Sequence, residues 1–147
     1  MTLRIVRLGS PRAPGERLRL GTVRRPPRGV KKEDFARRDF YDVWFPNLAP
    51  SEPLLKAFFP IEDDAAWKRF ARRYQAEMKE PFPRRDLDLV AALSHEMDLS
   101  LGCYCEDEAR CHRSLLRELL EARGAALAED TRTPPAVPDP PTPPANP

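Results

Sequence analysis

The sequence contains no long apolar run. Within its 147 residues, no stretch approaches the roughly 18 to 20 apolar residues that a membrane-spanning helix needs. The first nine residues alternate between apolar and polar side chains, unlike the charged start and apolar core of a secretory signal. We therefore expect a cytoplasmic protein without a membrane partner.

Cysteine, histidine and glycine are also scarce. The three cysteines lie within nine positions of one another, which does not make the disulfide framework of a small secreted fold. We interpret them as free thiols or metal ligands. His95 is not followed by the second histidine of an HExxH zinc motif, and neither a GxGxxG segment nor a P-loop occurs. A nucleotide phosphate would therefore need a different kind of binding loop.

The composition is that of one globular domain with unevenly distributed charge. Hydrophobic residues make up 41% and charged residues 33% of a chain long enough for one core. Residues 1–40 contain 12 Lys and Arg against 4 Asp and Glu, whereas the remaining residues contain 13 against 19. The basic half could attract an anionic partner, including nucleic acid, although solvated surface charge is an equally good interpretation.

Side-chain patterns predict a single small α/β domain of about four strands, with helices packed on the sheet. Apolar, β-branched and aromatic residues indicate strands at residues 3–6, 18–23, 40–45 and 99–105. Apolar side chains at helical spacing indicate helices at residues 51–59, 64–78, 86–97 and 115–124. Residues 31–38 are expected to form a short helix or a loop.

The end of the sequence differs in composition from the rest. Residues 131–147 contain eight prolines: Pro134, Pro135, Pro138, Pro140, Pro141, Pro143, Pro144 and Pro147. Such a segment has almost no side chain able to pack into a core. We predict a domain at residues 1–130 and a disordered proline-rich tail at residues 131–147.

The most reactive side chains follow the fourth predicted strand. Cys103 and Cys105 lie at its carboxyl end, and Cys111, His112 and Arg113 lie near the start of the last helix. Strand–loop–helix units of this kind build the sites of α/β proteins at the carboxyl ends of strands. A tight turn would bring the thiols, the imidazole and the guanidinium into one pocket.

Three interpretations of this cluster remain open. Cys105 and Cys111 could be nucleophilic or redox thiols with His112 as the base. Zinc could bind to four ligands, namely Cys103, Cys105, Cys111 and His112. The CxC spacing and the adjacent Cys111 and His112 are unusual for zinc, so we favour no metal or other cofactor. The thiols could also be buried packing residues, and we expect Cys103 to be buried but Cys105 and Cys111 to be more accessible.

A second candidate element, residues 22–32, follows the second predicted strand. Arg24, Arg25 and Arg28 could bind phosphate or carboxylate there, because a guanidinium group pairs with these anions through two parallel hydrogen bonds. If the second and fourth predicted strands are neighbours in the sheet, this loop and the cysteine segment share one edge. A solvated basic loop is the alternative.

Four segments together resemble a family of uncharacterised bacterial proteins, the domain of unknown function 488. They are RLRLGTVRRPPRGVKK (residues 17–32), DVWFPNLAPS (42–51), WKRFARRY (67–74) and CYCEDEARCHR (103–113). The resemblance implies a cytoplasmic α/β protein and supplies no established activity.

From the residues themselves we expect an enzyme or a ligand-binding domain for a small anionic substrate, similar to a phosphate or a nucleotide. The expected catalytic residues are Cys105, Cys111 and His112, and the expected substrate-binding residues are Arg24, Arg25, Arg28 and Arg113. The alternatives are a nucleic-acid-binding accessory protein and a structural zinc-binding or interaction protein.

Overall fold

The computed structural model describes residues 1–128, so the predicted tail at 131–147 lies outside the described residues. The strands of the described part are β1 (Leu3–Arg7), β2 (Leu18–Gly21), β3 (Val43–Trp44) and β4 (Leu99–Cys103). Its α-helices are α1 (Glu52–Phe58), α2 (Asp64–Met78), α3 (Pro81–Leu93) and α4 (His112–Ala122). Short 3₁₀ helices are η1 (Lys32–Asp34), η2 (Pro46–Leu48) and η3 (Glu108–Arg110). The predicted α/β domain is confirmed.

All four strands of the sheet run parallel in the order β1-β4-β2-β3. Strand β4 is an inner strand between β1 and β2, and every one of its residues is buried, which accounts for its run of small and apolar side chains. Its Leu99 pairs with Leu3 on one side and Leu18 on the other. Strands β2 and β4 are neighbours, so the condition under which the two candidate segments share one edge of the sheet is met.

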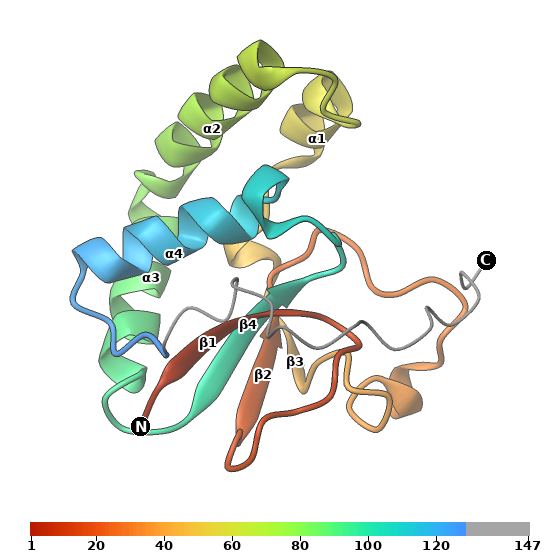
Figure 1. Cartoon of the computed structure of the whole chain (residues 1–147), viewed down its shortest axis with the longest axis vertical. Helices are drawn as coiled ribbons and strands as arrows, with labels where there is room; N and C mark the ends of the chain where they lie inside the picture. The colour runs from red at the N-terminus through yellow and green to blue at the C-terminus, as the bar shows by residue number, and fades with distance from the viewer. Residues whose placement is uncertain (129–147) are drawn as a thin grey trace, which may run out of the picture.

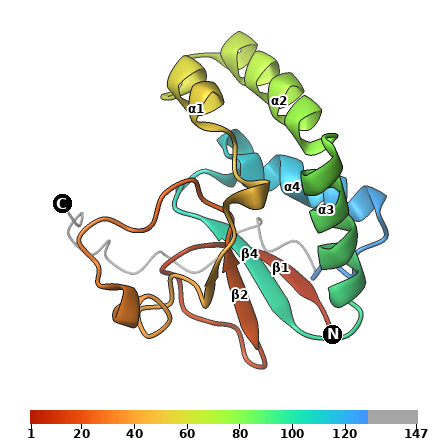
Figure 2. The same cartoon turned by 180° about the vertical axis from the view of Figure 1, so that it is seen from behind.

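The main hydrophobic core lies between one face of the sheet and the helices. Leu3, Leu99 and Leu101 of the sheet belong to the same buried cluster as Phe70 and Tyr74 of α2. In Figures 1 and 2, α3 and α4 lie nearer the sheet, and α1 and α2 extend beyond them. The segment between β2 and β3 lies on the opposite side of the molecule from α3. No helix of the described residues is long and apolar enough to cross a membrane.

A buried ion pair holds the loop before β2. Arg19 of β2 is fully buried and donates from Nε to Glu16 Oε1 over 2.9 Å. Its Nη1 donates to the carbonyl oxygens of Ser10 and Asp39, at 2.7 Å each. One arginine therefore joins the loop between β1 and β2 to the segment that precedes β3.

Several predicted element boundaries need correction; for example, α4 begins at His112 and not at Leu115, and β2 ends at Gly21 and not at Val23. The third strand pairs at only two of the six predicted residues, because only Val43 and Trp44 align with β2. Helix α3 begins at Pro81 and not at Asp86, since proline is well tolerated in the first helical turn. Helix α2 spans Asp64–Met78, as predicted, and its N-cap is Asp63, whose carboxylate accepts from the backbone N–H of Ala66. Strand β4 ends at Cys103, two residues before the predicted end.

Candidate functional site

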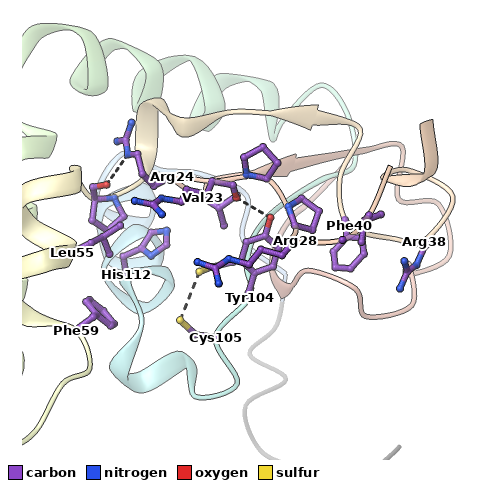
Figure 3. A pocket seen from close by; sticks show the side chains of 17 residues that line it. Val23, Arg24, Arg28, Arg38, Phe40, Leu55, Phe59, Tyr104, Cys105 and His112 are labelled. Carbon is purple, nitrogen blue, oxygen red and sulfur yellow. Dashed lines mark hydrogen bonds between the residues drawn. The ribbon is translucent and has the colours of Figure 1, made fainter. Parts of the chain in front are cut away.

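A cavity of about 770 Å³ opens at the carboxyl ends of β2 and β4. Its lining comes from the loop after β2, the start of α4, the α1 region and the residues that end β4 (Figure 3). The lining residues are Val23, Arg24, Arg25, Pro26, Pro27, Arg28, Gly29, Val30, Arg38, Phe40, Pro50, Leu55, Phe59, Cys103, Tyr104, Cys105 and His112. Both segments singled out in the sequence therefore border one space.

Four arginines line this cavity, in different local settings. Arg24 donates from Nε to the Pro50 carbonyl over 3.0 Å and from Nη2 to two further carbonyls, so its guanidinium is held in place. Arg25 forms an ion pair with Glu52. Arg28 is exposed, and no described carboxylate forms an ion pair with it. Arg38, which the sequence analysis missed, lies over the Phe40 ring.

Aromatic and aliphatic side chains form the rest of the wall. Figure 3 shows Leu55, Phe59 and His112 at one end of the cavity and Phe40 with Arg38 at the other. Tyr104 donates its hydroxyl hydrogen to the Arg25 carbonyl over 3.0 Å, and burial raises the pKa of its phenol. The aromatic residues were not predicted, because nothing local in the sequence distinguishes them from core residues.

The three cysteines converge beside the cavity. The sulfur of Cys103 lies 3.8 Å from that of Cys105, and the Cys111 sulfur lies 3.7 Å from Nδ1 of His112. Suitable ligand atoms of Cys103, Cys111 and His112 all lie within 4.8 Å of one another, so this group could hold a metal ion. Cys111 and His112, whose adjacent positions are unusual for a zinc site, therefore lie close enough to bind the same ion.

Accessibility differs among the thiols in a way that the sequence predicted only in part. Cys103 is buried, as predicted, and Cys105 is half-buried. Cys111 is fully buried and does not line the cavity, so its predicted accessibility is wrong. The reason is its place at the N-cap of α4, where the amphipathic helix packs onto the sheet.

Mutual hydrogen bonding makes the three thiols unequal as acids. Hydrogen bonding with Cys103 and Cys105 lowers the pKa of Cys111. Hydrogen bonding with Cys105 and Cys111 raises the pKa of Cys103. For Cys105 the bond with Cys103 lowers the pKa, but the bond with Cys111 and burial outweigh it and raise the pKa to about 11.

The acidic loop between the cysteines is neutralised by its own neighbours. Glu106 forms an ion pair with Arg7, and Glu108 accepts from Arg117 over 2.8 Å. Asp107 caps η3 by accepting from the backbone N–H of Ala109. These carboxylates are therefore occupied outside the thiol cluster.

His112 and Arg113 are both buried at the start of α4. The Nε2 atom of His112 lies 2.7 Å from the Thr22 carbonyl oxygen, which assigns the N–H to Nε2 and leaves a lone pair on Nδ1. Arg113 donates to the Cys105 carbonyl, and its Nε is buried without a partner in the described residues. Unlike His112, Arg113 does not line the cavity.

The fold and the cavity define the class of this protein: a small α/β domain with an open parallel sheet and a crevice at the carboxyl edge of that sheet. The chain belongs to the DUF488 family, because the family model described as the active DUF488-N3 subclade matches residues 3–124. This range holds all the strands and α-helices of the described residues and confirms the resemblance. No curated protein and no solved structure matches the chain.

Proposed function

We propose that this protein binds a small anionic ligand, similar to a phosphate or a nucleotide, in the cavity at the carboxyl edge of its sheet. The charge of the lining supports this proposal most strongly. Arg24, Arg25, Arg28 and Arg38 contribute to the wall, and none of the lining residues in the described chain is acidic. Guanidinium groups form charge-assisted hydrogen bonds with phosphate and carboxylate oxygens.

The apolar part of the wall indicates the rest of the ligand. Phe40, Phe59 and Tyr104 offer aromatic surface in the same cavity as the arginines. Its volume of about 770 Å³ is within the range of roughly 300–1,000 Å³ that is usual for small-molecule sites. A ligand with both an anionic group and a flat apolar group, such as a nucleotide, matches this combination. The catalytic roles expected for Cys105, Cys111 and His112 stay predictions.

Ion pairing in the basic half of the chain favours a small ligand over a nucleic acid. Arg12 forms a bidentate pair with Asp42, at 2.8 and 2.9 Å, and Arg19 is buried against Glu16. Part of the positive charge that the sequence shows at residues 1–40 is therefore already paired. The arginines of the cavity are a more concentrated target for an anion than the surface of this half.

The proposal is tested by thermal shift with inorganic phosphate, pyrophosphate and the common nucleoside phosphates. We expect at least one of these probes to raise the melting temperature in a concentration-dependent manner. In isothermal calorimetry, Arg28→Gln should weaken the binding of that probe by roughly tenfold to a hundredfold, because one charge-assisted hydrogen bond contributes roughly 1.5–3 kcal/mol.

Arg85→Gln is the matched control, since Arg85 is exposed on α3 and does not line the cavity. It should bind the probe as the wild type does. If no probe stabilises the wild type, or if both variants weaken binding equally, the proposal is wrong. Stabilisation by single-stranded DNA alone, with a steep dependence on salt, would support a nucleic-acid-binding protein instead.

A further inference from the structure

We propose that Cys103, Cys105, Cys111 and His112 bind one Zn²⁺ ion in a closed tetrahedral site beside the ligand cavity. Three sulfur ligands and one imidazole nitrogen form a usual ligand set of structural zinc in proteins. Soft thiolates also favour zinc over the hard cations magnesium and calcium. The proposal is independent of the ligand that the cavity takes.

Two distances between ligand atoms agree with the edges of a zinc tetrahedron. Bond lengths of about 2.3 Å to sulfur and about 2.0–2.1 Å to nitrogen place two sulfurs about 3.8 Å apart and a sulfur and a nitrogen about 3.5 Å apart. The observed separations are 3.8 Å between Cys103 and Cys105 and 3.7 Å between Cys111 and His112. Cys103, Cys111 and His112 already form a group of three. Cys105 lies outside this group, but its sulfur is 3.8 Å from that of Cys103, and its side chain must move to become the fourth ligand.

The orientation of His112 is that of a metal ligand. Its Nε2–H is directed at the Thr22 carbonyl, 2.7 Å away, and its Nδ1 lies beside the Cys111 sulfur. A histidine that binds metal through one ring nitrogen usually donates its other N–H to a backbone carbonyl or a carboxylate. The carbonyl of Thr22 therefore selects the tautomer that presents a free lone pair to the ion.

The start of α4 explains how two adjacent residues reach the same ion. Cys111 has extended backbone angles, φ −126° and ψ 149°, whereas His112 is the first residue of the helix. The chain changes direction between them, and the two ligand atoms come to lie on the same side. The unusual spacing in the sequence thus follows from a helix N-cap.

Charge balance gives a further reason for this assignment. Three thiolates and one Zn²⁺ ion carry a net charge of −1. Arg113 is buried and donates to the Cys105 carbonyl, and its Nε has no partner in the described residues. A buried cation is costly unless an anion lies nearby, and the zinc–thiolate centre would supply this anion.

With four protein ligands, the ion has no vacant coordination position, as in structural zinc sites. Cys103, Cys105 and His112 also line the cavity, so the ion would fix one of its walls. A ligand in the cavity would lie beside the zinc centre without coordinating it.

The first test measures metal in the wild-type protein, purified under reducing conditions without chelator. We expect one zinc per chain by elemental analysis and a lower melting temperature after chelation. Replacement with Co²⁺ should give the visible bands of a tetrahedral cobalt site and a sulfur-to-cobalt charge-transfer band. The absence of stoichiometric zinc together with the absence of this spectrum would overturn the proposal without any variant.

Variants test the ligand set. His112→Ala should lose the tetrahedral cobalt spectrum, whereas His95→Ala is the matched control and should retain it, because exposed His95 lies against Gly124 and away from the thiols. Cys105→Ser replaces the most exposed ligand and should weaken zinc binding at least tenfold with unchanged circular dichroism. Full retention of the spectrum in Cys105→Ser or His112→Ala would refute the four-ligand set. Bands that change on addition of inorganic phosphate would refute the closed site.

Discussion

Replacing Arg19 tests how much its buried contacts, which join the loop between β1 and β2 to the segment that precedes β3, contribute to the stability of the fold. In Arg19→Met the buried carboxylate of Glu16 loses donors at 2.9 and 3.1 Å and retains the backbone N–H of Ala13. The carbonyls of Ser10 and Asp39 each lose a donor at 2.7 Å. Breaking a buried ion pair by removing one partner costs about 3–5 kcal/mol, because it leaves the other charge buried and uncompensated.

The assay is urea unfolding at neutral pH, followed by tryptophan fluorescence and circular dichroism. Arg17→Met is the matched control, since Arg17 lies two residues away and is exposed. We expect this control to stay within about 0.5 kcal/mol of the wild type. The double variant Arg19→Met/Glu16→Gln removes both charges and should be more stable than Arg19→Met. If Arg19→Met and Arg17→Met unfold with the same free energy, the buried pair contributes nothing and the reasoning is refuted.

Three further predictions follow from individual contacts. Burial would raise the pKa of Glu16, but hydrogen bonds from Arg19 and other donors lower it below the ordinary 4.5. The stabilisation of the folded state by ionised Glu16 is therefore complete above pH 4.5 and is lost as the pH falls through the lowered pKa. In urea unfolding, Glu16→Gln should remove this part of the dependence of stability on acid pH. Gly102→Ala would place a Cβ 2.4 Å from Leu8 Cδ2 and 3.0 Å from the Val6 carbonyl oxygen, and it should cost about 1–3 kcal/mol by calorimetry; a neutral effect would contradict this close packing. Ser51→Ala removes the N-cap of α1 and should cost about 1 kcal/mol in the same measurement, whereas an unchanged melting temperature would show that the cap is dispensable.

The elements that were predicted well are those with a strong local pattern. Helix α2 was found from an apolar stripe, and its Phe70, Tyr74 and Met78 are buried. Strand β4 was found from a continuous run of apolar and small residues, and it is an inner strand between β1 and β2. Strand β3 was overpredicted, since aromatic residues favour a strand locally but only the register with β2 decides which of them pair.

Residue types and spacing alone also indicated the two segments that form the candidate site. They could not indicate Arg38, which reaches the cavity through the path of the chain between β2 and β3. Nor could they distinguish the half-buried Cys105 from the fully buried Cys111, because that difference arises from the packing of α4.

The sequence by itself thus determined the class of fold, the family and the segments rich in reactive side chains, because these depend on local periodicity, composition and motif. The tertiary structure decided which reactive groups meet. Parallel pairing of β2 with β4 brings the arginine loop to the cysteine segment, although Gly21 and Gly102 are far apart in the chain. The start of α4 then places Cys111 and His112 beside Cys103. Contacts between distant segments depend on strand order and helix packing, which no local pattern of residues specifies.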